Sequence, residues 1–163
     1  MFRTERLIIA PLEVPQIGAF LEDTSSYETR VAPWQHTMYH RRLTKLAAHV
    51  SEFTIRLIGQ EEAGFIGGIS LFRAGRRCPL PDEAELMYHI APRHQRKGYA
   101  TEAISRITEA ISTQSLSPIT TIRAFIENQN EASIRTAQSS SLAWESSSIT
   151  EQVYRYPAFP SEQ

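Results

Sequence analysis

The sequence predicts an α+β fold, of the α/β three-layer kind, in which a mixed sheet is flanked by helices. Short runs of apolar residues alternating with polar ones recur along the chain, and between them lie stretches with apolar residues at helical spacing. The length of 163 residues fits one domain, and we see no repeat or linker that divides it. We therefore expect a single domain over residues 1–163.

The first half is predicted to begin with a strand over residues 7–9, which Pro11 stops. A helix over 14–21 is expected to follow, with a proline tolerated in its first turn, and then a polar loop over 24–36. A second helix is predicted over 43–50, because apolar residues recur there at i, i+3, i+4 and i+7, namely Leu43, Leu46, Ala47 and Val50.

A hairpin is predicted next, from strands over residues 53–57 and 65–71 joined by a polar turn. The Gly67-Gly68 pair weakens the second strand or marks a bulge in it. A loop over 73–82 is expected to lead to a strand, in which Ala84, Leu86, Tyr88 and Ile90 alternate with Glu83, Glu85, Met87 and His89.

The second half continues with a basic loop over residues 93–98 and an amphipathic helix over 100–111. A strand over 122–126 and a helix starting near Glu131, which Asn128-Gln129-Asn130 can cap, are predicted after it. The serine-rich segment 139–148 gives no clear pattern. Alternation around Val153 indicates a last strand.

Composition excludes several classes of protein. Lys plus Arg is 17 and Asp plus Glu is 18, so 17 − 18 gives a net charge of −1, which argues against broad charge-driven binding to nucleic acid or anionic membrane. The one cysteine forms no internal disulfide, and no apolar run approaches the roughly 20 residues of a membrane helix. The amino-terminal residues lack a signal-peptide pattern, so we expect a cytoplasmic protein that binds neither nucleic acid nor membrane.

The segment from Glu83 to Ile111 predicts an anion site. A strand that leads through a glycine-containing loop into a helix presents main-chain N–H groups with no partner, at the positive end of the helix dipole. Gly98 lets the main chain approach an anion closely, and Arg93, Arg96 and Lys97 add positive charge. The dinucleotide and P-loop glycine patterns are absent. We therefore expect a pyrophosphate from a nucleotide-like cofactor at residues 95–100.

Four segments carry a resemblance to a known family. Gln95-Arg96-Lys97-Gly98-Tyr99-Ala100 matches Gln/Arg-x-x-Gly-x-Gly/Ala between a strand and a helix. Together with segments 4–9, 84–92 and 130–135, in that order, it resembles the GNAT-superfamily N-acetyltransferases, and most closely their Rim-type branch of ribosomal-protein N-terminal acetyltransferases. The resemblance spans about residues 1–145 and implies a mixed, mostly antiparallel sheet flanked by helices.

The resemblance implies acetyl-CoA as the acetyl donor. Main chain near His89 and Ile90 is expected to bind its pantetheine arm, and Asn130 and Ser133 are expected beside its thioester. The pyrophosphate is expected on the residues that open the helix, namely Gln95, Arg96, Lys97, Gly98, Tyr99, Ala100 and Thr101. No metal is expected.

The implied reaction is direct attack on the thioester by a primary amine, of a protein amino terminus or of a small molecule. An α-amine, with a pKa of about 7.7–8.0, asks little of its base. Glu85 matches the family's strand glutamate and is the first candidate for the base or amine-orienting group, with Glu83 second; the alternative is that both form a solvated acidic strand end. The carbonyl is expected to be polarised by a strand N–H near His89.

The sequence departs from the family at the following helix. Many members place a tyrosine there as general acid, at the position that Ala137 occupies here, so Ser133 or solvent is the candidate proton donor to the thiolate. The usual Gly-Phe or Gly-Met ending is Ser141-Leu142. These departures leave open a second interpretation, a catalytically weak acetyl-CoA-binding module.

Other chemistry-bearing residues have simpler explanations. His36 and His40 are spaced four apart with no evident third ligand, and Cys78 has no recognisable activating base. Tyr27, Trp34 and Tyr39 either line the acceptor cleft or close the core. The identity of the amine and the oligomeric state, monomer or homodimer, stay open.

Overall fold

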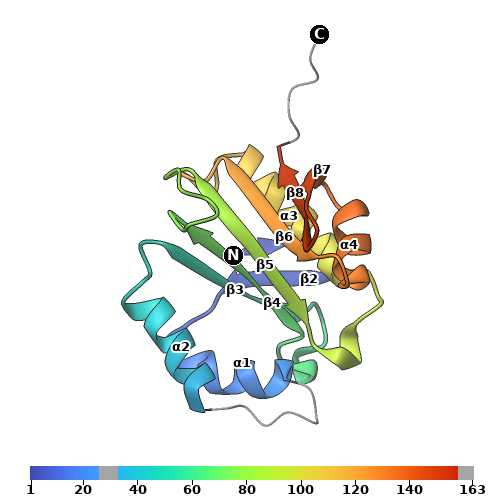
Figure 1. Cartoon of the computed structure of the whole chain (residues 1–163). Coiled ribbons are helices and arrows are strands. Elements are labelled where there is room, and N and C mark those ends of the chain that lie inside the picture. The colour runs from blue at the N-terminus through green and yellow to red at the C-terminus, as the bar shows by residue number, and fades with distance from the viewer. Residues whose placement is uncertain (26–32, 158–163) are drawn as a thin grey trace.

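The computed structural model of the protein describes residues 1–25 and 33–157, and within them the strands form one eight-stranded sheet in the order β1-β2-β3-β4-β5-β6-β8-β7 (Figure 1). The strands are β1 (Phe2–Arg3), β2 (Leu7–Pro11), β3 (Val50–Leu57), β4 (Gly67–Arg73), β5 (Glu83–Ile90), β6 (Thr121–Glu127), β7 (Ala143–Ser147) and β8 (Glu151–Tyr156). The α-helices are α1 (Ile17–Thr24), α2 (Pro33–Thr44), α3 (Tyr99–Ser112) and α4 (Glu131–Gln138). Short 3₁₀ turns span Val14–Gln16, Glu61–Ala63 and Pro92–His94.

Neighbouring strands pair antiparallel except β5 and β6, which run parallel. Their pairing is short, because it joins only Glu83–Glu85 to Thr121–Arg123. Past Glu85 the two strands no longer bond to each other, and a gap opens in the middle of the sheet. The predicted mixed, mostly antiparallel sheet is confirmed.

Helices cover both faces of the sheet, as the three-layer prediction requires. On one face, Ile104, Ile107 and Ile111 of α3 are buried against the sheet together with Leu86 and Ile122. Their spacing places them on one side of a helix, which is why the segment folds as an amphipathic helix on an apolar surface. On the other face lie α1 and α2, where Phe20 and Leu21 pack with Phe65 in a smaller core.

The predicted second helix is wrong in position. Helix α2 ends at Thr44, and the chain then turns, with the main-chain N–H groups of His49 and Val50 donating to the carbonyl of Leu46. Val50 already belongs to β3, where it pairs with Phe72. The helix also begins at Pro33, inside the segment predicted as loop, whereas residues 26–32 of that segment lie outside the described part of the chain.

The bulge considered for Gly67-Gly68 is also wrong. Gly67 pairs with Ile55 on one side and with Ile90 on the other, and the register is unbroken along β4. The glycine is needed for close approach instead, because a Cβ on Gly67 would lie 2.3 Å from the carbonyl oxygen of His89.

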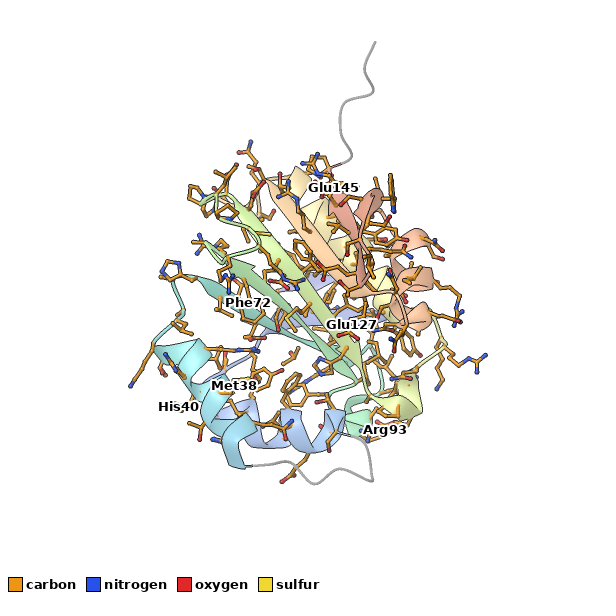
Figure 2. All side chains as sticks on the ribbon, viewed as in Figure 1. Met38, His40, Phe72, Arg93, Glu127 and Glu145 are labelled. Atoms are coloured by element: carbon orange, nitrogen blue, oxygen red, sulfur yellow. The ribbon has the colours of Figure 1, made fainter. Side chains whose placement is uncertain are left out.

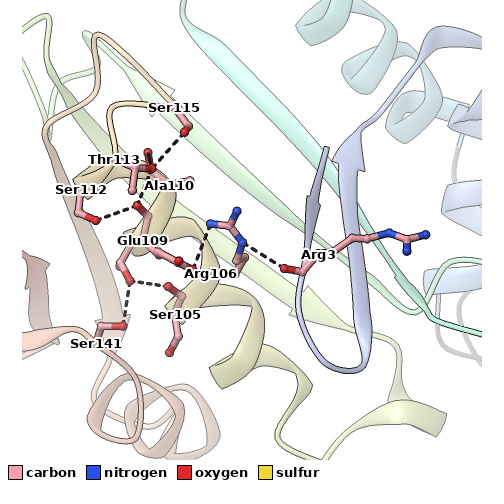
Figure 3. Close-up of polar contacts among 10 residues, drawn as sticks. Arg3, Ser105, Arg106, Glu109, Ala110, Ser112, Thr113, Ser115 and Ser141 are labelled. Atoms are coloured by element: carbon pink, nitrogen blue, oxygen red, sulfur yellow. Dashed lines mark hydrogen bonds and ion pairs between the residues drawn. The ribbon is translucent and has the colours of Figure 1, made fainter.

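The serine-rich segment contains a strand that the sequence did not indicate. The Ser140 hydroxyl donates to the carbonyl of Ala137 at 2.8 Å, which ends α4 without a glycine. The Ser141 hydroxyl pairs with that of Thr108 on α3 at 2.9 Å, in the group of contacts that Figure 3 shows. The chain then forms β7, which pairs with β8 and is irregular between Trp144 and Ser146. The short β1 was likewise not predicted. No helix in the described residues is long and apolar enough to cross a membrane.

Candidate functional site

A cavity of about 760 Å³ lies at the gap between β5 and β6. The end of β5, the loop into α3 and one face of α4 form its walls. Its lining residues are Tyr88, His89, Ile90, His94, Gln95, Arg96, Gly98, Tyr99, Ala100, Thr101, Asn130, Ala132, Ser133, Arg135, Thr136 and Ser139. Every residue predicted to bind the donor is in this list except Lys97.

The loop that enters α3 forms an anion cradle. Arg96 has φ of 62° and Gly98, which caps the helix, has φ of 80°, so the chain turns sharply just before the helix. No described residue accepts a hydrogen bond from the main-chain N–H groups of Tyr99, Ala100 and Thr101. These free amides, at the positive end of a 14-residue helix, fit a pyrophosphate.

Side chains of the same loop brace it. Gln95 donates through Nε2 to the carbonyl of Ile90 at 2.8 Å, which ties the loop back to the end of β5. Lys97 is not among the lining residues, and its carbonyl accepts a bond from Arg6 at 3.0 Å. Burial and the charges of Arg93 and Lys97 lower the pKa of His94, whose buried Nδ1 has no hydrogen-bond partner. Figure 2 shows Arg93 just beyond the end of β5.

Helix α4 supplies the opposite wall. The Asn130 side chain caps α4, because its Oδ1 accepts a hydrogen bond from the N–H of Ser133 at 3.1 Å. This oxygen is therefore already engaged within the helix. Four further residues of this wall were not predicted, namely Ala132, Arg135, Thr136 and Ser139. Their spacing of three, one and three puts them on one helical face, and this periodicity was the signal available in the sequence.

Two β5 residues near the gap differ in environment. The Tyr88 hydroxyl donates to the main-chain carbonyl of Ser133 at 3.0 Å, and burial raises the pKa of this phenol. His89 keeps exposed surface at the cavity, but its ring packs edge-on against Phe20 of α1 with centroids 5.6 Å apart. Burial of the imidazole lowers the pKa of His89, which favours the neutral ring.

The two candidate carboxylates do not line the cavity. Glu83 is buried and paired with Arg123 at 2.6 Å, and Arg123 also contacts Glu145 at 3.0 Å. Although burial opposes its charge, bonds from both carboxylates raise the pKa of Arg123. Glu85 is half-buried at the last parallel pair, where the gap begins. At about 3.3 Å per residue, it lies about 13 Å along β5 from His89.

The face that α1 and α2 cover carries a buried polar group. Arg42 of α2 donates to Glu52 at 2.9 Å, and its guanidinium lies over Phe72, which Figure 2 shows beside α2. Burial raises the pKa of Glu52, although bonds from Ser70 and Arg42 oppose that rise. Burial and the charge of Glu52 raise the pKa of Tyr39 to about 12.

Tyr39 packs edge-on against Phe20 and so helps to close the smaller core. Tyr27 and the side chain of Trp34 lie outside what the structure describes. Within the described ranges, no group of three or more His, Cys, Asp or Glu residues could hold a metal. Cys78 is buried beside Arg123, and burial raises the pKa of its thiol.

Solved structures share this fold. An acetyltransferase from Agrobacterium tumefaciens is 23% identical, with 96% of this chain and 93% of that chain covered and a TM-score of 0.67. A spermidine N-acetyltransferase from Vibrio cholerae, in complex with CoA and spermine, is 15% identical, with coverage of 93% and 94% and a TM-score of 0.65. A ribosomal L7/L12 alpha-N-protein acetyltransferase, in complex with coenzyme A, is 11% identical, with coverage of 93% and 94% and a TM-score of 0.68. At these identities the likeness establishes the fold. The search of curated proteins found no match.

The sheet opens between two parallel strands, and the next helix begins with free main-chain N–H groups, an arrangement that fits an extended, phosphate-bearing donor. The model of the family described as "Acetyltransferase (GNAT) domain" matches residues 6–141, so the chain belongs to the GNAT acetyltransferases. Members of this family are transferases that take the acetyl group from acetyl-CoA. The free amides at residues 99–101 and the basic residues beside them fit that donor.

Proposed function

We propose that the protein is an N-acetyltransferase, which transfers an acetyl group from acetyl-CoA to a primary amine. The observation that carries this proposal is the cavity at the gap between β5 and β6, with the anion cradle in its wall. The amine belongs to a protein amino terminus or to a small molecule.

Two of the similar structures support this choice of acceptors. One is a ribosomal L7/L12 alpha-N-protein acetyltransferase and the other a spermidine N-acetyltransferase. The motifs at residues 4–9, 84–92 and 130–135 favour the Rim-type branch, and with it an α-amine acceptor. Such an amine needs only a weak base, since its pKa is about 7.7–8.0 against about 10.4 for lysine.

In the proposed reaction the neutral amine nitrogen attacks the thioester carbonyl carbon. A new C–N bond forms, the C–S bond breaks, and the amine proton passes to a base while the thiolate takes up a proton. We assign the base to Glu85, acting through water from the apex of the gap. A main-chain N–H near His89 polarises the carbonyl, and Ser133 or solvent protonates the thiolate. Glu83 is the second candidate, because Arg123 already pairs with it.

The proposal is tested by incubating the protein and acetyl-CoA with peptides and small amines, and detecting the gain of one acetyl group by mass spectrometry. Glu85→Gln is expected to lower kcat about a hundredfold and to remove the acid limb of its pH profile. Glu62→Gln, which changes an exposed glutamate between β3 and β4, is the matched control. An unchanged kcat and pH profile in Glu85→Gln would reject Glu85 as the base.

One observation favours a second function, a catalytically weak acetyl-CoA-binding module. Ala137 is fully buried and carries no proton to donate, and none of the lining residues is Asp or Glu. Thermal stabilisation by CoA without release of free thiol, across the whole panel of amines, would support this function over the enzyme.

A further inference from the structure

The turn between β1 and β2 is attached to the first turn of α3. Arg6 donates through Nε to Glu102 at 2.7 Å and through its main-chain N–H to the same carboxylate at 3.1 Å. The Thr4 hydroxyl also donates to Glu102. The Glu102 side chain is only 17% exposed, so this carboxylate in the first turn of α3 is enclosed by the amino-terminal turn.

Arg6 reaches the cradle loop as well. Its Nη1 donates to the carbonyl of Lys97 at 3.0 Å, and its guanidinium lies 4.8 Å from the centre of the Tyr99 ring. Its Nη2 lies 3.5 Å from the place that a Cβ on Gly98 would occupy. One guanidinium therefore contacts Lys97 and Tyr99, the residues on either side of the glycine that caps α3.

The turn that carries Arg6 is itself fixed. Arg106, farther along α3, donates to the carbonyl of Arg3 at 3.1 Å, a contact that Figure 3 shows. Its guanidinium also lies 5.1 Å from the centre of the Phe2 ring. On its other side the turn continues into β2, which pairs with β3 in the sheet. Arg6 is thus held from both ends.

The negative charge of Glu102 lies at the end of α3 where the pyrophosphate is proposed to bind, and Arg6 is the cation that offsets it. A carboxylate in the first turn suits the helix dipole, but it repels a pyrophosphate that binds at the same helix end. Burial by itself raises the pKa of Glu102, but the bonds from Thr4 and Arg6 and the charge of Arg6 outweigh burial and lower it. The carboxylate is therefore ionised at neutral pH, and Arg6 is the cation that neutralises it.

We propose that Arg6 is a positioning residue for the donor's pyrophosphate, which fixes the cradle at residues 97–99 and cancels the charge of Glu102. This inference rests on the proposed use of acetyl-CoA. It gives the Thr4-Glu5-Arg6 segment a role in donor binding, although the segment lines no part of the cavity.

The test compares two donors. S-acetylpantetheine keeps the thioester and the pantetheine arm but has no pyrophosphate. Arg6→Ala is expected to raise the Kd of CoA, measured by calorimetry, by about tenfold or more, as the loss of charge-assisted bonds predicts. In the same variant kcat/KM for S-acetylpantetheine should stay within about twofold of wild type, since its arm does not reach the cradle.

A second pair of variants separates charge from shape. Arg6→Ala combined with Glu102→Gln removes the unpaired carboxylate and should recover part of the lost CoA affinity. Arg6→Lys keeps the charge but loses the fork of bonds, so its Kd should fall between wild type and Arg6→Ala. Arg76→Ala, which removes an exposed cation from the loop between β4 and β5, controls for net charge and should leave Kd unchanged.

An unchanged CoA Kd in Arg6→Ala would overturn the proposal. A kcat/KM for S-acetylpantetheine that falls by as large a factor as the CoA affinity, together with a lower Tm, would also overturn it, because this pattern indicates a merely structural contact. Where Arg6→Ala does not fold, Arg6→Lys and the double variant decide by the same comparison. A wild-type protein that binds no CoA would reject the proposed function itself, and this is seen before any variant is made.

Discussion

The Tyr88 hydroxyl on β5 donates to the main-chain carbonyl of Ser133 on α4 at 3.0 Å. Tyr88 lies past the last parallel pair of the two strands, and Ser133 lies in the first turn of α4. The bond therefore joins two walls of the cavity where the sheet no longer does so, and it sets the distance between them.

Tyr88→Phe keeps the ring and removes only this bond. A neutral hydrogen bond contributes about 0.5–1.5 kcal/mol, so we expect a comparable loss of unfolding free energy and a CoA Kd raised about two- to tenfold. Denaturant unfolding and calorimetry measure the two quantities. Tyr156→Phe, in β8 and outside the cavity lining, is the control. If Tyr88→Phe matched wild type in both measurements, the bond would have no role in the cavity.

Gly98→Ala tests the backbone of the cradle. A Cβ there would have room, since its nearest neighbour is Arg6 at 3.5 Å, but φ of 80° is a conformation that alanine adopts at a cost of about 1–2 kcal/mol. We expect Tm to fall by several degrees, at about 2–4 °C per kcal/mol, and CoA to bind more weakly as the loop relaxes. Gly75→Ala, in open space without a positive φ, should change neither quantity. Equal Tm values for the two variants would contradict this account.

The sequence predicted the strand, loop and helix of this segment because their signals are local. A strand, a glycine at a forced φ and an amphipathic helix follow one another between Glu83 and Ser112, and each has a pattern of its own. The same holds for the Asn130 cap. Elements far apart in the chain gave no such signal, and so the bond from Tyr88 to Ser133 and the attachment of Arg6 to Glu102 were not predicted.

The errors have physical causes too. Leu43 and Val50 are spaced as on one helix, but Leu43 packs beside the smaller core from α2 whereas Val50 is buried from a strand. Periodicity alone does not tell these apart. Strand β7 was missed because it lies at the edge of the sheet with an exposed Trp144, so alternating burial left no mark on its sequence.

Gly67→Ala tests the close approach of β4 to β5, because main-chain atoms of β5 lie very near the place that a Cβ on Gly67 would occupy. A Cβ there would meet the His89 carbonyl oxygen at 2.3 Å and Ile90 Cδ1 at 2.8 Å, so β4 and β5 must move apart. We expect a loss of about 1–3 kcal/mol, as for overpacking elsewhere, with weaker CoA binding because the same main chain lines the cavity. Denaturant unfolding measures the first and calorimetry the second.

Gly18→Ala is the matched variant, and it is expected to raise the free energy of unfolding rather than lower it. Gly18 lies in α1 with nothing within 4 Å of its Cβ position, so alanine should stabilise the helix by about 0.5–1 kcal/mol. A Gly67→Ala protein as stable as wild type would show that the two strands adapt without cost.

The lowered pKa of His89 predicts that the free energy of unfolding depends on pH. Burial lowers its pKa from the ordinary 6.5, so between that value and the folded-state pKa the unfolded chain binds a proton that the folded chain does not. The contribution of His89 to stability is therefore complete above about pH 6.5 and is lost as the pH falls through this window. His89→Gln should flatten the decline in unfolding free energy below that pH.

His40→Gln is the control, since His40 lies on the surface of α2 whereas the imidazole of His89 packs against Phe20. Chemical denaturation at intervals from pH 7.5 downward gives the curves for wild type and both variants. The Phe20 ring packs edge-on against His89 and has no titratable group. The change in charge at this contact therefore comes from the imidazole of His89. Parallel curves for wild type and His89→Gln across the window would mean that the imidazole accepts its proton in the folded protein as freely as in the unfolded chain.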